Sequence, residues 1–399
     1  MFEHKPIETV ADAQRRAKKK LPKAVYTAIM AGNENGATFR ENIDAFTKIG
    51  FAPRVGGEIA PKRDMRTSIL GQDISMPVVI SPAAAQAIHP EGEVAVARAA
   101  ARAGTAIGQS NFAPSRFEDV VAANPKAFFQ LYWSGTKDVI EERIERFRRA
   151  GAKGLILTLD ATMTQPRDWG SPTIPQKVNL ATLIRYSPMA IGNPAWVLRF
   201  LRHGTLPNLT VPNLQKAGES APPTMIDGMV EWTETPIPTW RDIQWLGGVW
   251  KGPFMVKGIL SADDARRAVD VGATAIGVSN HGGNNLDTTP SPLRFLPAVV
   301  AAVGDQAEVT FDSGIRRGAD VVKVLALGAK AALIGRSWFI GLAADGERGV
   351  AEVLDAYRLS LDRTLIGLGK SSIHDLTRED LIVPDGYFLQ SASDLPLTA

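Results

Sequence analysis

The chain has 399 residues, of which 45% are hydrophobic and 22% are charged, a balance typical of a globular protein with a large core. Its 45 Lys and Arg residues against 42 Asp and Glu residues leave a net charge of +3, which argues against a nucleic-acid-binding surface. The basic run over residues 15–20 is interpreted as the solvated face of a helix. The absence of cysteine excludes disulfides, thiolate metal sites and a cysteine nucleophile.

The sequence gives no support for a membrane-spanning protein, a secreted protein or a metalloprotein. No apolar run approaches the roughly 18 to 20 residues that span a membrane, and the opening MFEHKPIETV lacks the basic and apolar regions of a signal peptide. No spacing of His, Asp and Glu residues suggests a metal site. We therefore expect a cytoplasmic protein without a metal ion.

A recurring unit organises the chain: an amphipathic stretch rich in Ala and Arg, then a glycine, then a short run of β-branched and apolar residues. The glycine suits the left-handed position that ends a helix, and short apolar strands bounded in this way are typical of parallel sheets buried on both faces. The four units end their helices at Gly104, Gly151, Gly272 and Gly328.

Adding four further apolar runs to these units gives eight strands in chain order, with helical patterns between most of them. The predicted strands are 77–81, 105–110, 128–132, 154–160, 253–257, 274–279, 308–312 and 331–335. This alternation predicts an α/β protein built as a single (β/α)8 TIM barrel over residues 1–399.

Three segments lie outside the alternation. Residues 1–60 are expected to form an N-terminal cap, and residues 345–399 to close the barrel. The long, Pro-rich segment 161–250 after the fourth strand is expected to be a lid or insertion on the catalytic face. Its basic amphipathic run at 196–202 is alternatively a helix that touches a membrane, but this run is too short to favour that interpretation.

Polar residues end every predicted strand, and in a TIM barrel these ends converge on the face where catalytic residues lie. The strand-end residues are Ser81, Ser110, Gln130, Tyr132, Thr158, Asp160, Lys257, Ser279, Asn280, His281, Asp312, Gly335 and Arg336. Capping alone does not explain so many of them, so the pattern predicts a functional site.

The last two strands end in glycine-bearing turns, FDSGIRRGAD and LIGRS, that lead into helical patterns. Backbone N–H groups at such turns, together with Arg316, Arg317 and Arg336, predict a phosphate-binding site, which in this fold usually follows strands seven and eight. The alternative is ordinary turn glycines with surface arginines. The sequence contains neither GxGxxG after a first strand nor GxxxxGK[ST], so dinucleotide-binding Rossmann and P-loop sites have no support.

His281 is the only one of five histidines at a predicted strand end. Asp160, across the barrel, would accept a hydrogen bond from one ring nitrogen and leave the other as a base. Lys257 would add a fixed positive charge on the same face. A base, a carboxylate and a cation beside a phosphate site suit a flavin enzyme that accepts a hydride.

At these residues the chain resembles the FMN-dependent α-hydroxy-acid oxidase and dehydrogenase family, over almost its whole length. The resemblance is carried by LPKAVY, SPAAAQAIHPEGE, FFQLY, LTLDA, VKG, SNHGGNNLD, DSGIRRGADVVKVLALGA and IGR. Among these, SNHG-x-x-x-LD together with D-x-G-x-RRG-x-D is highly specific.

The resemblance implies a role for each matching position and a homo-oligomeric assembly. His281 resembles the catalytic base, Asp160 the carboxylate that orients it, and Lys257 the lysine beside flavin N1. Tyr132 resembles an active-site tyrosine and Arg167 an arginine that binds the substrate carboxylate. FMN contacts are implied for Pro82, Ala83, Ala84, Ser110, Gln130, Thr158, Lys257 and Ser279, and phosphate contacts for Asp312, Gly314, Arg316, Gly335 and Arg336.

Three positions depart from the family pattern. Asn284 stands where the family has a second carboxylate-binding arginine, Ala28 where it has a tyrosine, and Phe112 where it often has a tryptophan. A buried arginine–carboxylate pair contributes on the order of 2 to 5 kcal/mol, so simple 2-hydroxy acids are expected to bind poorly. Asn284 remains a candidate substrate contact.

A narrower resemblance, in RDWGSPTIP, PIPTW, NHGGNNLD and MAIGNP with LPNLTVPN, is to the flavoproteins of mycofactocin biosynthesis. It implies a peptide-derived substrate, a Val-Tyr α-amino lactam that is oxidatively deaminated to an α-keto amide. An L-lactate or other 2-hydroxy-acid dehydrogenase or oxidase is the alternative. A barrel that only binds a phosphorylated ligand or a peptide is disfavoured because Lys257, Asp160 and His281 are all present.

Overall fold

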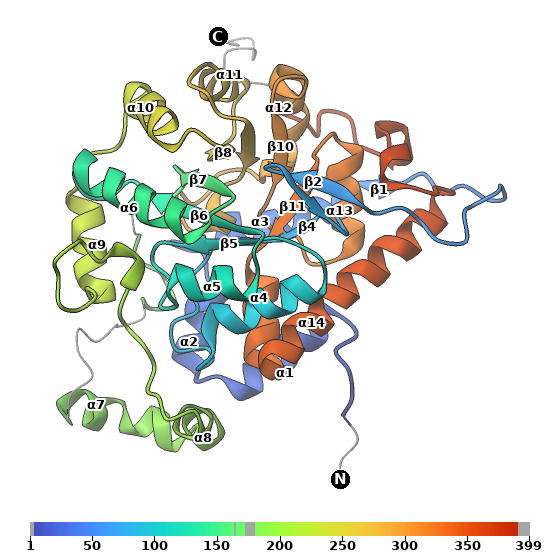
Figure 1. The fold of residues 1–399 in the computed structure, drawn as a ribbon. Coiled ribbons are helices and arrows are strands. Elements are labelled where there is room, and N and C mark those ends of the chain that lie inside the picture. Colours follow the sequence, from blue (N-terminus) through green and yellow to red (C-terminus); the bar gives the residue numbers. More distant parts are fainter. Residues whose placement is uncertain (1–3, 163–164, 172–179, 390–399) are drawn as a thin grey trace.

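A computed structural model describes residues 4–162, 165–171 and 180–389. At its centre, eight parallel strands form a closed barrel in the order β10-β11-β4-β5-β6-β7-β8-β9 (Figure 1). These strands are β4 (Val78–Ile80), β5 (Ile107–Ser110), β6 (Ala127–Tyr132), β7 (Gly154–Thr158), β8 (Phe254–Ile259), β9 (Ala275–Val278), β10 (Glu308–Phe311) and β11 (Ala331–Ile334). The predicted TIM barrel is confirmed.

Helices follow the strands and cover the outside of the barrel (Figure 1). They are α4 (Gly92–Arg102), α5 (Phe117–Ala123), α6 (Lys137–Ala150), α10 (Trp240–Trp250), α11 (Ala262–Asp270), α12 (Leu296–Val303), α13 (Gly318–Ala326) and α14 (Arg336–Gly367). The glycines of the four repeated units all have positive φ, 71° at Gly104, 99° at Gly151, 96° at Gly272 and 98° at Gly328. The predicted left-handed helix ends are therefore confirmed.

A hairpin closes one end of the barrel. Strands β2 (Thr67–Ile69) and β3 (Gln72–Ile74) pair antiparallel, and their side chains join the cluster of inward-facing barrel residues. The shared cluster consists of Ile69, Leu70, Ile74, Val79, Ala106, Phe128, Ile156, Met255, Ala275, Ala331 and Leu333. Apolar packing thus fills this end, and the opposite end, where the strands finish, carries the polar residues.

The two ends of the chain meet beside the barrel. Helix α1 (Val10–Lys20) packs on α14, which bends where Asp345 and Gly346 leave helical geometry. Strand β1 (Gly50–Phe51) pairs antiparallel with β12 (Leu381–Ile382). The remaining N-terminal helices are α2 (Lys23–Ile29) and α3 (Ala37–Asp44), and short 3-10 helices lie at Ala45–Lys48, Pro212–Leu214, His281–Gly283, Pro292–Arg294, Ile373–Asp375 and Arg378–Asp380.

The long segment after β7 contains more helix than the sequence suggested. It forms α7 (Leu180–Ile191), α8 (Pro194–Arg202), α9 (Met225–Glu234) and α10, of which only the α8 region was predicted. Helix α10 packs on α6 and buries Ile243 and Leu246 in the main core, so it is a regular barrel helix rather than part of an insertion. Positions 163–164 and 172–179 of this segment, like 390–399 of the C-terminal one, lie outside the described residues.

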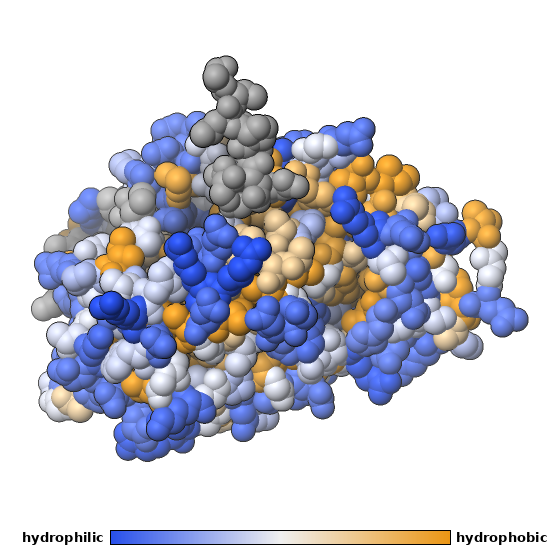
Figure 2. Space-filling view, turned by 90° about the horizontal axis from the view of Figure 1, so that it is seen from above, coloured by the Kyte–Doolittle hydropathy of each residue, from blue (hydrophilic) through white to orange (hydrophobic). Residues whose placement is uncertain are grey.

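The face shown in Figure 2 is mainly hydrophilic, with smaller hydrophobic patches between the charged side chains. Most large apolar residues of the chain are used inside, in the barrel and under its helices. Within the described ranges, no helix combines the length and the apolarity needed to cross a membrane.

Candidate active site

A hydrogen-bonded cluster forms where β7, β8 and β9 end. Because neighbouring parallel strands finish at the same edge, Asp160, Lys257 and His281 come together although they are far apart in sequence. The His281 Nδ1 atom lies 3.0 Å from Asp160 Oδ1, and the His281 backbone N–H donates to Asp160 Oδ2 at 2.8 Å. The carboxylate thus fixes both the backbone and the ring of the histidine.

Lys257 is enclosed by acceptors. Its Nζ donates to Asp160 Oδ2 at 2.9 Å and to Ser279 Oγ at 2.8 Å, and lies 3.2 Å from Asp312 Oδ2. Lys257 is 3% exposed and Asp160 5% exposed, so little water screens the pair.

For both Lys257 and Asp160, the interactions with neighbouring charges together shift the pKa further than burial does. Burial lowers the pKa of Lys257, but the Asp160 and Asp312 carboxylates raise it well above its usual value. Burial likewise raises the pKa of Asp160, but Lys257 and His281 hold it well below its usual range. The lysine and Asp160 are therefore both charged at neutral pH.

Tyr132, at the end of β6, faces the other ring nitrogen of the histidine. Its hydroxyl lies 3.2 Å from His281 Nε2. Burial raises the pKa of Tyr132, so the hydroxyl keeps its proton at neutral pH. When Nδ1 donates to Asp160, Nε2 carries the lone pair and points at this hydroxyl.

The turn that carries His281 is held in a left-handed conformation, with φ 57° at His281 and 64° at Gly282. A Cβ atom at Gly282 would come 2.4 Å from Arg336 Nη1, so this position needs glycine. Left-handed backbone at a non-glycine residue is strained and is common at functional sites.

A cavity of about 160 Å³ adjoins the cluster, at the ends of β4, β10 and β11. Of the residues assigned to FMN and its phosphate, the cavity is lined by Pro82, Ala83, Lys257, Asp312, Gly314, Arg316, Gly335 and Arg336. Gly314 has φ 91°, and a Cβ atom there would come 1.9 Å from the Asn42 carbonyl of α3. The glycine therefore lets the N-terminal segment pack directly over this turn.

The two arginines of the cavity differ in their contacts. Arg316 Nη1 donates to the Ile315 carbonyl at 2.8 Å, and burial lowers the pKa of Arg316. Neither Arg316 nor Arg336 has a carboxylate within ion-pair distance in the described part of the chain. Burial, followed by repulsion from Arg316 and Arg167, lowers the pKa of Arg336 to about 9.

The Arg336 side chain holds the N-terminal segment in place. It donates to three backbone carbonyls, those of Ile29 at 2.9 Å, Ala31 at 2.6 Å and Gly282 at 2.8 Å. The Arg336 guanidinium, which was assigned to the phosphate, is thus directed at the end of α2 and at the turn that carries His281. Gly335 and the start of α14 line the cavity.

The residues assigned to the substrate side lie near this guanidinium. With its amide oriented so that both groups are matched, Asn284 donates to the Ala31 carbonyl at 2.9 Å and accepts from Arg336 Nη2 at 3.0 Å. Arg167 is close enough to Arg336 to lower its pKa, and its own buried Nη1 has no hydrogen-bond partner among the described residues. Ala28 lines the cavity.

Buried polar atoms without partners mark the ends of β6 and β7. Gln130 Nε2 and Oε1 and Thr158 Oγ1 make no hydrogen bond in the part of the chain described. Leaving such a group unsatisfied costs about 1 to 3 kcal/mol, so these atoms suit a polar ligand. Ser110, on the neighbouring strand β5, accepts from the Phe112 N–H at 3.2 Å.

One aromatic neighbour of the site was missed by the sequence analysis. The Trp232 ring, from α9, lies 5.7 Å from the ring of Tyr132 and 6.4 Å from that of Phe112. The capping box of Thr224 and Asp227, which begins α9, was the available sign of this helix. Nothing in the sequence indicates that α9 lies beside the end of β6.

Known proteins resemble this chain along most of its length. The family described as FMN-dependent dehydrogenase matches residues 17–383. A pre-mycofactocin synthase of Mycobacterium tuberculosis (strain CDC 1551 / Oshkosh) is 55% identical over 381 residues, 96% of each chain. Glycolate oxidase 1 of Oryza sativa subsp. indica is 37% identical over 374 residues, 93% of this chain and 95% of the other.

Solved structures agree with these sequence comparisons. A structure of the monotopic membrane protein (S)-mandelate dehydrogenase superposes with a TM-score of 0.85 at 32% identity, covering 95% of this chain and all of the other. A mandelate oxidase variant with 2-hydroxy-phenylacetamide superposes with a TM-score of 0.73 at 29% identity, covering 94% of this chain and 98% of the other.

Proposed function

Because the chain belongs to the FMN-dependent dehydrogenase family, we propose that Tyr132, His281, Asp160 and Lys257 form its catalytic site. The protein is an FMN-dependent oxidoreductase. The observation that supports the site is the continuous chain of contacts from the Tyr132 hydroxyl through the His281 ring and the Asp160 carboxylate to Lys257 Nζ.

The residues present fit FMN. The polar atoms of Gln130 and Thr158, which have no partner among the described residues, suit the polar edge of a flavin ring. Arg316, whose guanidinium has no carboxylate partner in the same part of the chain, suits a phosphate. We assign Pro82, Ala83, Ala84, Ser110, Gln130, Thr158, Lys257 and Ser279 to the ring and ribityl chain, and Asp312, Gly314, Arg316, Gly335 and Arg336 to the surroundings of the phosphate.

Bound FMN supplies a two-electron acceptor that takes a hydride from the substrate carbon. The chain's own residues handle the proton. Asp160 accepts from His281 Nδ1, so Nε2 is the basic nitrogen and takes a proton from the substrate. The same carboxylate stabilises the imidazolium that forms. Lys257 offsets negative charge that builds up on this face.

For the substrate, we propose an α-amino lactam of the Val-Tyr type. His281 takes a proton from the amine nitrogen while the hydrogen on the adjacent carbon leaves as a hydride, which gives an imine. Water then hydrolyses the imine to an α-keto amide and ammonia. Two observations support this choice: the 55% identity to a pre-mycofactocin synthase, and Asn284 and Ala28 in place of the family's second arginine and tyrosine.

A 2-hydroxy acid is the second candidate substrate. The half-buried Arg167, with one buried guanidinium nitrogen free of partners among the described residues, favours a carboxylate. With Asn284 already engaged between Ala31 and Arg336, this single arginine would carry most of the binding.

Anaerobic mixing of the FMN-loaded protein with each substrate class distinguishes the two, because reduction bleaches the flavin. We expect the α-amino lactam to bleach it far faster than saturating L-lactate or glycolate, since buried groups left unmatched lower the rate by several powers of ten. Rapid bleaching by L-lactate and none by the lactam would contradict the amine substrate. The His281→Ala variant, mixed with both, is the control for a histidine-dependent reaction.

A further inference from the structure

A second cavity, of about 400 Å³, lies next to the catalytic one. Its walls come from α2, from the loop 84–88 after β4, and from α7 and α8 of the long segment after β7. Ala28, Ile29 and Phe339 line both cavities, so these residues form the wall that the two spaces share. Small-molecule sites begin at roughly 300 Å³, so this volume is enough for a ring with its substituents.

The lining of this cavity selects for an uncharged group. Among the described residues that line it, none is a Lys, Arg, Asp, Glu or His. Apolar side chains predominate, among them Val25, Met189, Val197 and Leu201. A charge placed here would lose its hydration without gaining a partner, whereas an apolar group would gain from leaving water.

Aromatic rings on the wall favour a flat ring in the cavity. Trp196 and Phe200, one turn apart on α8, meet edge to face with ring centroids 5.2 Å apart. Phe339 contributes a third ring at the boundary with the catalytic cavity. Edge-to-face and offset contacts with a further aromatic ring add to the energy of simple burial.

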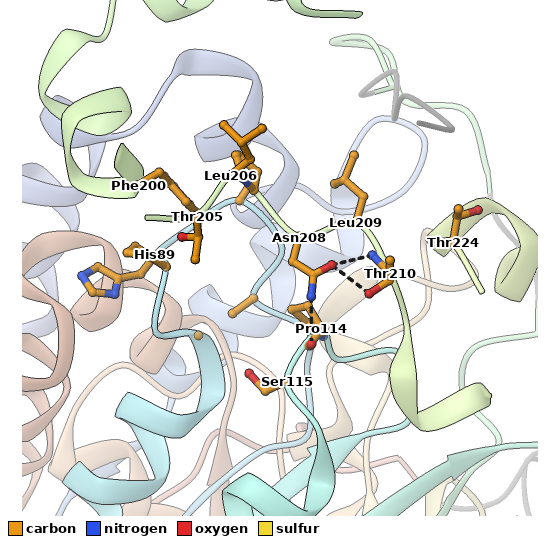
Figure 3. A pocket seen from close by; sticks show the side chains of 15 residues that line it. His89, Pro114, Ser115, Phe200, Thr205, Leu206, Asn208, Leu209, Thr210 and Thr224 are labelled. Carbon is orange, nitrogen blue, oxygen red and sulfur yellow. Dashed lines mark hydrogen bonds between the residues drawn. The ribbon is translucent and has the colours of Figure 1, made fainter. Parts of the chain in front are cut away.

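The walls are fixed by hydrogen bonds. Trp196 Nε1 donates to the Ala87 carbonyl at 2.9 Å and ties α8 to the loop after β4. Leu206 and Leu209 lie on segment 205–210, which separates this cavity from a larger neighbouring one of about 640 Å³. Figure 3 shows Asn208 of this segment bound to Pro114 (3.2 Å) and to the Thr210 N–H (2.9 Å). The cavity is therefore formed before a ligand binds.

We infer that this cavity is a specificity subsite for an uncharged aromatic substituent of the substrate. The substituent would occupy the space between α2 and α8 while the reacting carbon lies beside His281. Ala28 is the smallest residue of the wall that the two cavities share, so it leaves the most room for a substituent to reach from one space into the other. The position of the reacting carbon rests on the proposed function; the preference of the cavity for a neutral ring does not.

The test measures binding by calorimetry to the full FMN-loaded chain, with two probes that cannot be oxidised because they lack the amine. One is a benzyl-substituted pyrrolidinone and the other is the unsubstituted pyrrolidinone. Val197→Trp fills the cavity from α8, and Met189→Trp fills it from α7. Leu198→Trp is the matched control, since Leu198 is the next residue on α8, is 49% exposed and does not line the cavity.

We expect the wild type and Leu198→Trp to bind the benzyl probe equally, and the two filled variants to bind it more weakly by roughly tenfold or more. Binding of the unsubstituted probe should not change. Failure of the wild type to bind the benzyl probe more tightly than the unsubstituted one, or equal binding by both filled variants, would overturn the inference. If the benzyl probe binds as expected but no amine-bearing lactam bleaches the flavin, the proposed reaction fails and the subsite stands.

Discussion

Asp160 joins the proposed base to the proposed cation through one carboxylate. Its oxygens accept from the ring and backbone of His281, from Lys257 Nζ and from the Ser279 hydroxyl. A carboxylate with this many donors stays ionised although it is buried. A change at any member of the cluster therefore affects both the orientation of the histidine and the charge balance of the site.

Replacing His281 tests whether its imidazole is needed for proton transfer and not for cofactor binding. His281→Ala is expected to retain FMN and to slow flavin reduction by roughly 100-fold or more, the usual effect of losing a general base. Asp160→Asn should slow it less, because it disturbs the tautomer and orientation of the ring without removing it. Stopped-flow absorbance under anaerobic conditions measures both. Reduction of His281→Ala at the parental rate would place the base elsewhere.

Lys257→Met leaves Asp160 and Asp312 buried without their cation. We expect unfolding to require about 3 kcal/mol less, the order found when one partner of a buried ion pair is removed. In the parent, the lowered pKa of Asp160 adds stability that is lost as the pH falls below its unfolded value, and the raised pKa of Lys257 adds stability that is lost at high pH.

In the Lys257→Met variant the sign reverses for Asp160. Without the cation, burial raises the pKa of Asp160 above its unfolded value, so the folded state takes up a proton and loses stability as the pH rises. The deficit relative to the parent should therefore be larger at about pH 8 than at about pH 5 in urea titrations. Equal deficits at both pH values would mean that the carboxylates find other partners.

At the scale of elements, the periodic parts of the chain were predictable and the long segment after β7 was not. Buried strands and helix-ending glycines recur in the sequence because each βα unit repeats the same local geometry. Helix α10 falls within the predicted insertion because the gap between the two strands is long and Pro-rich, although its capping box of Thr239 and Asp242 is a usable sign of a helix.

The difference between the repeating βα units and the non-repeating segments also explains how much of the site was predictable. Strand-end residues such as Lys257 and Asp312 follow from the barrel register, because each strand delivers its last side chains to a known face. The position of Trp232 and the apolar cavity between α2 and α8 depend on how non-repeating segments pack. No local pattern encodes that packing.

A buried arginine joins the barrel to this segment. Arg143 of α6 is 2% exposed and donates to the Ser134 carbonyl at 2.8 Å, the Leu214 carbonyl at 2.8 Å and Glu231 at 2.7 Å. Glu231 belongs to α9, whose next residue, Trp232, contacts Tyr132. The arginine therefore fixes α9 relative to the proposed catalytic tyrosine.

We expect Arg143→Met to loosen α9 without unfolding the barrel, because Glu231 and two carbonyls lose their donor. Unfolding should require roughly 1 to 3 kcal/mol less, and amide hydrogens in 209–235 should exchange faster. Hydrogen-exchange mass spectrometry measures this directly. Arg149→Met, in the same helix with a side chain 71% exposed, should leave the exchange unchanged. Similar exchange rates in the two variants would show that the apolar contacts of α9 are enough to hold this helix in place without Arg143.

At the scale of the whole molecule, we expect cofactor binding and stability to be coupled through Arg316 and Arg336, because neither guanidinium has a carboxylate partner in the described residues. Removing FMN is expected to lower the melting temperature, because binding to the folded state alone stabilises it. Inorganic phosphate should restore part of the loss by supplying the missing counter-charge, and riboflavin, which has no phosphate, should restore less. Thermal unfolding with each addition tests this. If phosphate raises the melting temperature of Arg316→Met as much as that of the parent, the stabilisation does not depend on this arginine.

The β2–β3 hairpin has a consequence for how such a protein can change over generations. It closes the end of the barrel where the strands begin, so the residues that hold the eight strands together are not the residues that meet a substrate. Exchanges such as arginine for Asn284 or tyrosine for Ala28 act at the far rim, where they leave the interior layers untouched. A lineage can therefore acquire a new substrate by a few replacements at that rim and inherit its scaffold unchanged.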